Sequence, residues 1–341
     1  MRSIRHFAVQ YCAAAIALLG CLGFVFVSSA LAQPAAPQRP KLRPGFTAEY
    51  DVKYVPDGDA AQALDIYFPD KLGDKPLPLL IWIHGGGWSG GSKTGMPYLY
   101  QLGRGYVVAS LEYRFSQKAV FPAQIQDCQA AIRFLRANSK KYGIDPERVG
   151  VGGGSAGGHL AALVGTSGGK KAFPPIGGNE DQSDRVQAVC DIYGPTNFWT
   201  VVKQADEDKN VKNIFQWNSG DPYSRLIGAK LGEDKEKCDA VSPVHYVSKD
   251  NPPFLILHGD RDALVPYAQS EELRDLLAKA GVEVTLQKLP GAGHGGPAFG
   301  LPAIARLTTA FFDKHLKGVE AKIEALPESE VTVPPPANSP K

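Results

Sequence analysis

The chain has 341 residues, of which 43% are hydrophobic and 21% charged, which is the ordinary composition of a globular protein. It carries 37 Lys and Arg against 35 Asp and Glu and has no block rich in Lys and Arg, which argues against a nucleic-acid-binding protein. The length permits one large α/β domain or two smaller domains.

The first 32 residues have the features of a secretory signal peptide. Two arginines precede an apolar run over 8–27, and Ala30 and Ala32 form the small-x-small pattern that signal peptidase requires. We therefore predict cleavage of residues 1–32, a secreted or periplasmic protein, and no stable membrane association. An uncleaved N-terminal membrane anchor is one alternative, since the run is nearly long enough to span a bilayer. Lipoprotein processing at Cys21 is a second alternative.

Removal of the predicted signal peptide takes away two arginines and no acid, which leaves 35 basic and 35 acidic residues. This balance again indicates no nucleic-acid partner. Three cysteines remain, Cys128, Cys190 and Cys238, and none belongs to a C-x-x-C pair. The odd number and the spacing indicate neither a disulfide framework nor a zinc site.

Composition divides the mature chain into three parts. A Pro- and Ala-rich stretch over 33–45 is typical of a linker. Residues 319–341 lack a periodic apolar face, and we predict that this tail is disordered. A single catalytic domain is expected between them, over 46–318.

Strand-like and helix-like patterns alternate along this domain. The expected strands, in chain order, cover 63–69, 77–86, 106–114, 148–154, 186–194, 253–260 and 282–294. The expected helices cover 125–143, 156–165, 270–281 and 301–316. Several strands are almost continuously apolar, as in parallel sheets buried on both faces. The pattern predicts an α/β fold with a mostly parallel, doubly wound sheet.

One region interrupts the alternation. An insertion within 166–245 contains long polar stretches around the predicted strand 186–194. We expect it above the C-terminal ends of the strands, where open α/β sheets bind ligands.

The stretch 153–157 (Gly-Gly-Ser-Ala-Gly) fits the G-x-S-x-G pattern between a predicted strand and a predicted helix, which is the setting of a nucleophile elbow. Such a sharp turn would expose the hydroxyl of Ser155 above the sheet. Gly153 and Gly157 must be small because larger side chains would collide across the turn. A dinucleotide-binding loop is disfavoured because no acid ends a strand about 20 residues further on. We expect alanine to be better tolerated at Gly152, Gly154 and Gly158.

A second glycine-rich motif, His-Gly-Gly-Gly-Trp over 84–88, follows the apolar run Leu-Leu-Ile-Trp-Ile. Consecutive glycines allow backbone N–H groups to point into a cavity. We predict an oxyanion hole formed by the N–H groups of Gly86, Gly87 and Ala156. The two motifs together indicate a hydrolase far more specifically than either does alone.

The general base is predicted to be His294, in the loop after the last expected strand, because the chain order serine, acid, histidine is typical of this arrangement. His159 lies in the helix behind Ser155, where its side chain would point away from the hydroxyl. Two acids follow the expected strand 253–260. Asp260 is expected to cap the turn, and Asp262 to reach the imidazole, fix its tautomer and stabilise the imidazolium.

At these residues the chain resembles esterases of the α/β-hydrolase fold. It is similar to the hormone-sensitive-lipase-like proteins and to the bifunctional feruloyl and acetyl-xylan esterase-like proteins. The resemblance covers about residues 50–318 and is weak for the substrate. It implies ester hydrolysis through an acyl-enzyme with no metal or organic cofactor. It is carried by residues 84–88 and 153–158 and by the stretches FPAQIQDCQAAIRFLR, SPVHYVSKDNPPFLILHGDRDALVP and GAGHGG.

We therefore expect an exported serine esterase with the catalytic residues Ser155, Asp262 and His294. The resemblance and the predicted export suggest deacetylation of acylated carbohydrate, so the partner is a small-molecule or polysaccharide-linked ester. Alternatives are a general short-chain carboxylesterase, a peptidase or amidase of the same fold, and a non-catalytic binding module. Candidates for lining an acyl or sugar pocket are Trp88, Tyr193, Trp199 and Trp217.

Overall fold

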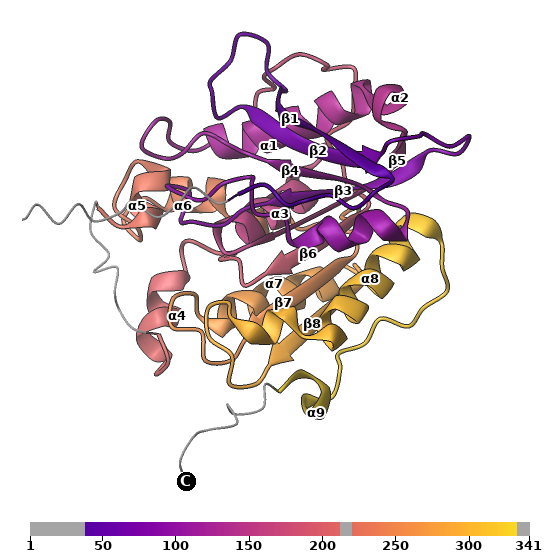
Figure 1. Ribbon diagram of the computed structural model, residues 1–341. Coiled ribbons are helices and arrows are strands. Elements are labelled where there is room, and N and C mark those ends of the chain that lie inside the picture. Colours follow the sequence, from indigo (N-terminus) through magenta and orange to yellow (C-terminus); the bar gives the residue numbers. More distant parts are fainter. Residues whose placement is uncertain (1–37, 212–219, 333–341) are drawn as a thin grey trace, which may run out of the picture. The chain divides into compact units, whose positions relative to one another are not determined.

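The computed structural model describes residues 38–211 and 220–332, in which eight strands form one sheet (Figure 1). The spatial order is β1-β2-β4-β3-β5-β6-β7-β8. Strand β2 is antiparallel to β1 and β4, and all other pairs are parallel. The mostly parallel sheet is thus confirmed. The strands are β1 Phe46–Lys53, β2 Ala63–Pro69, β3 Leu77–Ile83, β4 Val107–Leu111, β5 Ile144–Gly154, β6 Ala188–Ile192, β7 Phe254–Gly259 and β8 Val284–Leu289.

Helices cover both faces of this sheet. The longer α-helices are α1 Ala123–Ala137, α3 Ala156–Ser167, α7 Tyr267–Lys279 and α8 Pro302–Lys317. Helices α1, α3 and α7 pack on one face, and α8 packs on the other together with the 3₁₀ helix η1 Pro97–Arg104 (Figure 1). The short helices are α2 Ser139–Tyr142, α4 Val201–Glu207, α5 Pro222–Ile227, α6 Lys235–Val241, η2 Pro243–Tyr246, η3 Pro297–Gly300 and α9 Glu328–Val331.

Two layers of helices explain why the strands are apolar along their whole length. Successive side chains of a strand point to opposite faces, so Leu80 packs beneath α8 and η1, whereas Ile81 packs beneath α1 and α3. Each fully buried side chain of this size contributes roughly 1.5–3 kcal/mol relative to an exposed one. Both layers are therefore required to bury the apolar strands.

Strand β1 was not predicted. Its residues are partly or fully exposed, and Tyr50 remains 41% exposed. An edge strand has a neighbour on one side only, so its apolar pattern is weak. The predicted helix over 125–143 is correct in position but ends at Ala137, and α2 follows it as a separate turn.

The predicted insertion divides into two parts with different positions. Its first part lies against α1, where Arg133 Nη2 donates to the carbonyl of Ile176 at 2.8 Å and Arg136 Nη1 donates to that of Ser183 at 2.6 Å. The second part follows β6 and contains α4, α5 and α6. Its helix α5 contributes side chains to the cavity above Ser155.

The predicted disordered tail is wrong for residues 319–332. Thr285 of β8 donates its hydroxyl to the carbonyl of Ile323 at 2.9 Å, and the N–H of Leu326 donates to Gln287 Oε1 at 2.6 Å. Val331 is completely buried. These apolar side chains are irregularly spaced, so they fit the sheet edge without forming a periodic face.

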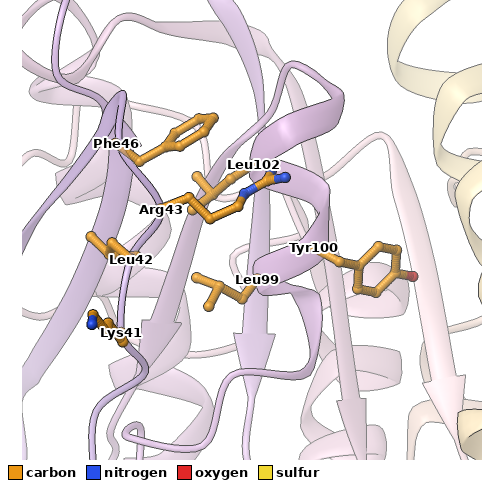
Figure 2. Close-up of a pocket in the computed structure, with 7 residues that line it drawn as sticks. All are labelled: Lys41, Leu42, Arg43, Phe46, Leu99, Tyr100 and Leu102. Carbon is orange, nitrogen blue, oxygen red and sulfur yellow. The ribbon is translucent and has the colours of Figure 1, made fainter.

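The described part of the predicted linker also packs on the domain. Arg39 Nε donates to the buried carboxylate of Asp65 at 2.8 Å. Further along, residues 41–46 and helix η1 enclose a cavity of about 340 Å³ (Figure 2). The linker prediction is therefore wrong for 38–45. The predicted signal peptide lies outside the described residues, among which no helix is long and apolar enough to cross a membrane.

Candidate active site

Ser155 occupies a strained turn between β5 and α3. Its backbone angles are φ 56° and ψ −122°, a conformation that costs a residue with a side chain on the order of 1–3 kcal/mol. Two backbone hydrogen bonds hold the turn: the Ser155 N–H donates to Ile192 O at 2.9 Å, and the His159 N–H donates to Ser155 O at 2.9 Å. The structure therefore has the elbow that the sequence pattern predicted.

The two outer glycines leave no space for a side chain. A Cβ added to Gly153 would lie 2.3 Å from the carbonyl oxygen of Gly157, and one added to Gly157 would lie 2.1 Å from that of Ile83. Both obstacles are backbone atoms, which cannot move away without distorting the sheet. The requirement for small residues at these two positions is confirmed.

The expected tolerance of the neighbouring glycines is only partly correct. A Cβ on Gly152 would lie 2.1 Å from the hydroxyl oxygen of the buried Tyr98, and one on Gly158 would lie 2.8 Å from the carbonyl oxygen of Ile192. The prediction is wrong at both positions. At Gly154 the nearest atom is the Tyr193 hydroxyl oxygen at 3.1 Å, which requires a much smaller adjustment.

The structure brings Ser155, His294 and Asp262 into one hydrogen-bonded row. His294 Nε2 lies 2.8 Å from Ser155 Oγ, and His294 Nδ1 lies 2.7 Å from Asp262 Oδ2. The three residues come from the elbow after β5, the loop after β7 and the loop after β8. Because these three strands are parallel, their C-terminal ends meet at one edge of the sheet.

Asp262 is almost completely buried, with 1% of its surface exposed. Burial by itself raises the pKa of this carboxyl, but the interactions with the imidazoles of His258 and His294, hydrogen bonds above all, outweigh that effect. The pKa of Asp262 therefore lies well below its usual range. Asp262 is therefore ionised at any pH at which His294 could act as a base, and its negative charge can stabilise the imidazolium.

Asp260 lies two positions earlier and does not contact the row. Its Oδ1 accepts the N–H of Gly291 at 2.7 Å, which connects the loop after β7 to the loop after β8. The Asp260 side chain thus joins two loops instead of capping its own turn, and Asp262 is the acid that contacts the imidazole.

The glycine loop 84–88 approaches the elbow closely. A Cβ on Gly85 would lie 2.7 Å from the carbonyl oxygen of Gly154. Gly86 and Gly87 have φ angles of 117° and 58° and line the same cavity as Ser155. Ala156 is the first residue of α3, where N–H groups have no acceptor within the helix. Of the residues predicted to form the oxyanion hole, Gly86 and Gly87 thus line the cavity with Ser155, and Ala156 directly follows it in the chain.

His84 anchors the start of this loop. Its Nε2 lies 2.6 Å from Glu112 Oε1, and its ring stacks on Tyr113 with the ring centres 4.6 Å apart. The hydroxyl of Tyr113 donates to the carbonyl of His84 at 3.1 Å. The side chain is therefore held away from Ser155, as expected for a residue that supports the loop.

His159 is excluded as a base by its surroundings. Its Nδ1 accepts the indole N–H of Trp88 at 3.1 Å, and its Nε2 donates to the carbonyl of Val241 at 2.8 Å. Burial lowers the pKa of His159 to about 4, so the ring is neutral near pH 7. Arg114 and Asp127 are also occupied in a structural contact. They form an ion pair at 2.9 Å, in which the Asp127 side chain is completely buried.

A cavity of about 530 Å³ lies above Ser155, a size typical of small-molecule sites. Two of the predicted pocket residues, Trp88 and Tyr193, line it. Trp199 does not line it and is 39% exposed, with Lys235 Nζ 5.6 Å from its ring centre. Trp217 lies outside the described residues. Lining side chains that the sequence did not identify are Trp82, Ser89, Pro195, Pro222, Tyr223, Leu264 and Val265.

Comparisons with known proteins find similarity to esterases. The sequence model of the BD-FAE family matches residues 64–277. The chain is 33% identical to Esterase LipQ of Mycobacterium tuberculosis over 263 residues, which are 75% of this chain and 58% of that protein. It is 35% identical to Carboxylesterase NlhH of the same species over 270 residues, which cover 74% and 77% of the two chains. The chain thus spans little more than half of LipQ.

Solved structures with the same fold include carbohydrate-active enzymes. A truncated carbohydrate esterase from gut microbiota is 30% identical with a TM-score of 0.70, and the match covers 83% of this chain and 99% of that one. An acetyl ester-xyloside bifunctional hydrolase from Caldicellulosiruptor lactoaceticus is 28% identical with a TM-score of 0.57, covering 75% and 87%. The architecture is the α/β-hydrolase fold.

Proposed function

The chain belongs to the BD-FAE family, and from this premise we propose that it is a serine esterase that cleaves carboxylic ester bonds through an acyl-enzyme. The observation that carries the proposal is the row of Ser155, His294 and Asp262, with contacts of 2.8 and 2.7 Å at the cavity. The homologues named above as esterases support it.

In the proposed acylation step, the Ser155 oxygen attacks the ester carbonyl carbon while His294 Nε2 accepts the hydroxyl proton. The carbonyl oxygen becomes an oxyanion, which the N–H groups of Gly86, Gly87 and Ala156 stabilise. His294 then donates its proton to the leaving alkoxide, and the alcohol departs. Asp262 remains ionised and stabilises the imidazolium throughout.

Deacylation uses the same groups in the same order. His294 accepts a proton from water while the water oxygen attacks the acyl carbon, and the oxyanion forms again at the same N–H groups. When the tetrahedral intermediate collapses, His294 returns the proton to Ser155. The products are the free acid and the original enzyme, so atoms and protons balance.

Acylated carbohydrate of the acetyl-xylan or feruloyl type is the proposed substrate. The family match and the two carbohydrate-directed structural relatives support this choice. Among the described residues, the cavity is lined by aromatic, aliphatic and small side chains, with His294 the only titratable group besides tyrosine. Such a lining suits a neutral ester, whereas a charged acyl group would be desolvated without a partner.

A general short-chain carboxylesterase is the second candidate function. It is favoured by the match to NlhH, which the chain covers over 77% of its length at 35% identity. Acetate release from acetylated xylan, compared with p-nitrophenyl acetate at equal enzyme concentration, distinguishes the two. Turnover of the small ester alone would favour the general esterase.

The test of ester hydrolysis itself compares the wild type with Ser155→Ala. We expect the wild type to hydrolyse p-nitrophenyl acetate and the variant to lose at least about 10³-fold in kcat, since the nucleophile is absent. Circular dichroism of both proteins checks that they are folded. A folded wild type that cleaves none of p-nitrophenyl acetate, acetylated xylan and methyl ferulate would refute the proposal.

Export through residues 1–32 is proposed on the sequence pattern alone. N-terminal sequencing of the mature protein after expression in a bacterial host tests it. A chain that begins at Gln33 supports cleavage, whereas an intact or lipid-modified N-terminus would support the anchor or the lipoprotein alternative.

A further inference from the structure

A second imidazole contacts the carboxylate of Asp262. His258, on β7, is completely buried, and its Nε2 lies 3.3 Å from Asp262 Oδ2. The same oxygen lies 2.7 Å from His294 Nδ1. The mechanism described above requires only one imidazole, so it assigns no task to His258.

The neighbours of His258 determine which ring nitrogen carries the proton. Nε2 faces two acceptors, Asp262 Oδ2 and the carbonyl oxygen of Val265 at 3.2 Å, so it must be the N–H. Nδ1 lies 2.6 Å from Ser270 Oγ on α7. A hydroxyl can donate to a ring nitrogen. The contacts are therefore satisfied when Ser270 donates to Nδ1 and Nε2–H donates to the carbonyl of Val265, with Asp262 Oδ2 beside it at 3.3 Å.

The other oxygen of Asp262 is also occupied. Oδ1 accepts the N–H of Leu264 at 2.8 Å and that of Val265 at 3.0 Å. His258 thus contacts the one oxygen that also holds His294. If this contact is lost, Oδ2 keeps His294 as its partner, and His294 lies on the loop after β8.

We propose that His258 is a positioning residue, which holds the Asp262 carboxylate in line with His294, and that Ser270 sets the tautomer of His258. This inference rests on the proposed function, because it assumes that the row performs ester hydrolysis. Displacement of a reacting group by about 1 Å reduces catalysis by roughly 10²-fold. His258 does not line the cavity, so its loss should lower kcat and leave KM unchanged.

The first experiment compares His258→Leu, which removes the donor, with His258→Gln, which keeps an N–H near the Nε2 position. We expect kcat for p-nitrophenyl acetate to fall by roughly 10²-fold in His258→Leu, with recovery to within about fivefold of the wild type in His258→Gln. Ser270→Ala should give an intermediate loss. The matched control is His315→Leu on α8, whose histidine lies next to Glu283 and whose kinetics should equal those of the wild type.

A double-mutant cycle separates positioning from a merely structural role. In the Asp262→Ala background, there is no carboxylate to hold, so His258→Leu should reduce kcat by less than about twofold. Equal losses of kcat in the two backgrounds would overturn the inference, even if His258→Leu lowers the melting temperature. Wild-type kcat and KM in folded His258→Leu would also overturn it.

The failure of this inference can be distinguished from failure of the proposed function. If the wild type itself hydrolyses no ester, or if Ser155→Ala is equally active, the proposed function is wrong. If the wild type is active and dependent on Ser155, but His258 and Asp262 are not coupled, only the positioning role is wrong.

Discussion

Two aspartates in the loop after β7 differ in their tasks although they are only two positions apart. Asp262 is buried and contacts His294 at 2.7 Å, whereas Asp260 accepts an N–H from Gly291. The distinction follows from the direction in which the turn presents each side chain. We therefore expect the change from Asp to Asn to affect catalysis at one of these positions and stability at the other.

We expect Asp262→Asn to reduce kcat/KM by about 10⁴-fold, because an amide cannot stabilise the imidazolium and favours the wrong tautomer of His294. Asp260→Asn should retain activity and lose roughly 1 kcal/mol of unfolding free energy, the value of one hydrogen bond. Esterase kinetics and urea unfolding of both variants measure these effects. The opposite pattern would exchange the two assignments.

A third carboxyl, Asp191, gives a prediction about pH. It is completely buried at the end of β6, where its Oδ1 accepts the N–H of Gly194 at 3.0 Å, and Oδ2 has no partner among the described residues. Burial raises the pKa of Asp191 from 3.8 to about 7 against the effect of this hydrogen bond. Between these values, the folded protein therefore binds a proton that the unfolded chain has released.

The folded state binds more protons in this window, so its stability must fall as the pH rises from about 4 to 7. We expect Asp191→Asn, which cannot ionise, to remove this contribution, on the order of a few kcal/mol. Urea unfolding at several pH values across the window measures it. Parallel pH dependences of the wild type and Asp191→Asn would contradict the assignment.

At the scale of elements, the turn from β5 to α3 is constrained by close contacts on two sides. It packs against β3 and the glycine loop on one side and against β6 on the other. Only Gly153 is constrained most closely from within the turn, by Gly157. The constraints on Gly152, Gly157 and Gly158 come from segments distant in sequence, which contain Tyr98, Ile83 and Ile192.

The structure predicts different outcomes of alanine substitution along this turn. Gly154→Ala should change the free energy of unfolding by less than about 1 kcal/mol, because its closest contact, at 3.1 Å, is with one side-chain oxygen. Gly152→Ala should lose about 1–3 kcal/mol or more through overpacking against the buried Tyr98. Thermal unfolding of both variants is the measurement. Equal melting temperatures would show that Tyr98 moves freely.

At the scale of the whole domain, both ends of the described chain stabilise the sheet. Arg39 pairs with the buried Asp65 of β2, and residues 323–331 lie beside β8. The two outer parts of the sheet are therefore covered by segments that composition alone assigns to a linker and a tail.

Ile323→Ala combined with Val331→Ala tests the contribution of the C-terminal segment. Their side chains are 9% and 0% exposed, and each large-to-small change costs about 1–3 kcal/mol in unfolding free energy. We expect a melting temperature lower by roughly 5 °C or more. Lys322→Ala, which removes the exposed side chain that precedes Ile323, is the control and should leave the melting temperature unchanged. If the double variant has the melting temperature of the wild type, the segment does not stabilise the domain.

The sequence by itself determined the alternation of elements, the elbow and the identities of Ser155, His294 and Asp262 as neighbours in the fold. These features depend on local backbone sterics and on hydrophobic periodicity, which a single chain segment displays. The edge strand β1 was missed because its partners, rather than its own pattern, make it a strand.

Only the tertiary structure decided which side chains surround the row. His258, Tyr98 and Tyr223 are unremarkable in sequence, and they meet Asp262, Gly152 and the cavity because the fold brings β7, η1 and α5 to these places. It also decided that Trp199 lies at the surface and that residues 319–332 are ordered on the sheet. Contacts of this kind depend on distances between segments far apart in the chain, and no local pattern contains them.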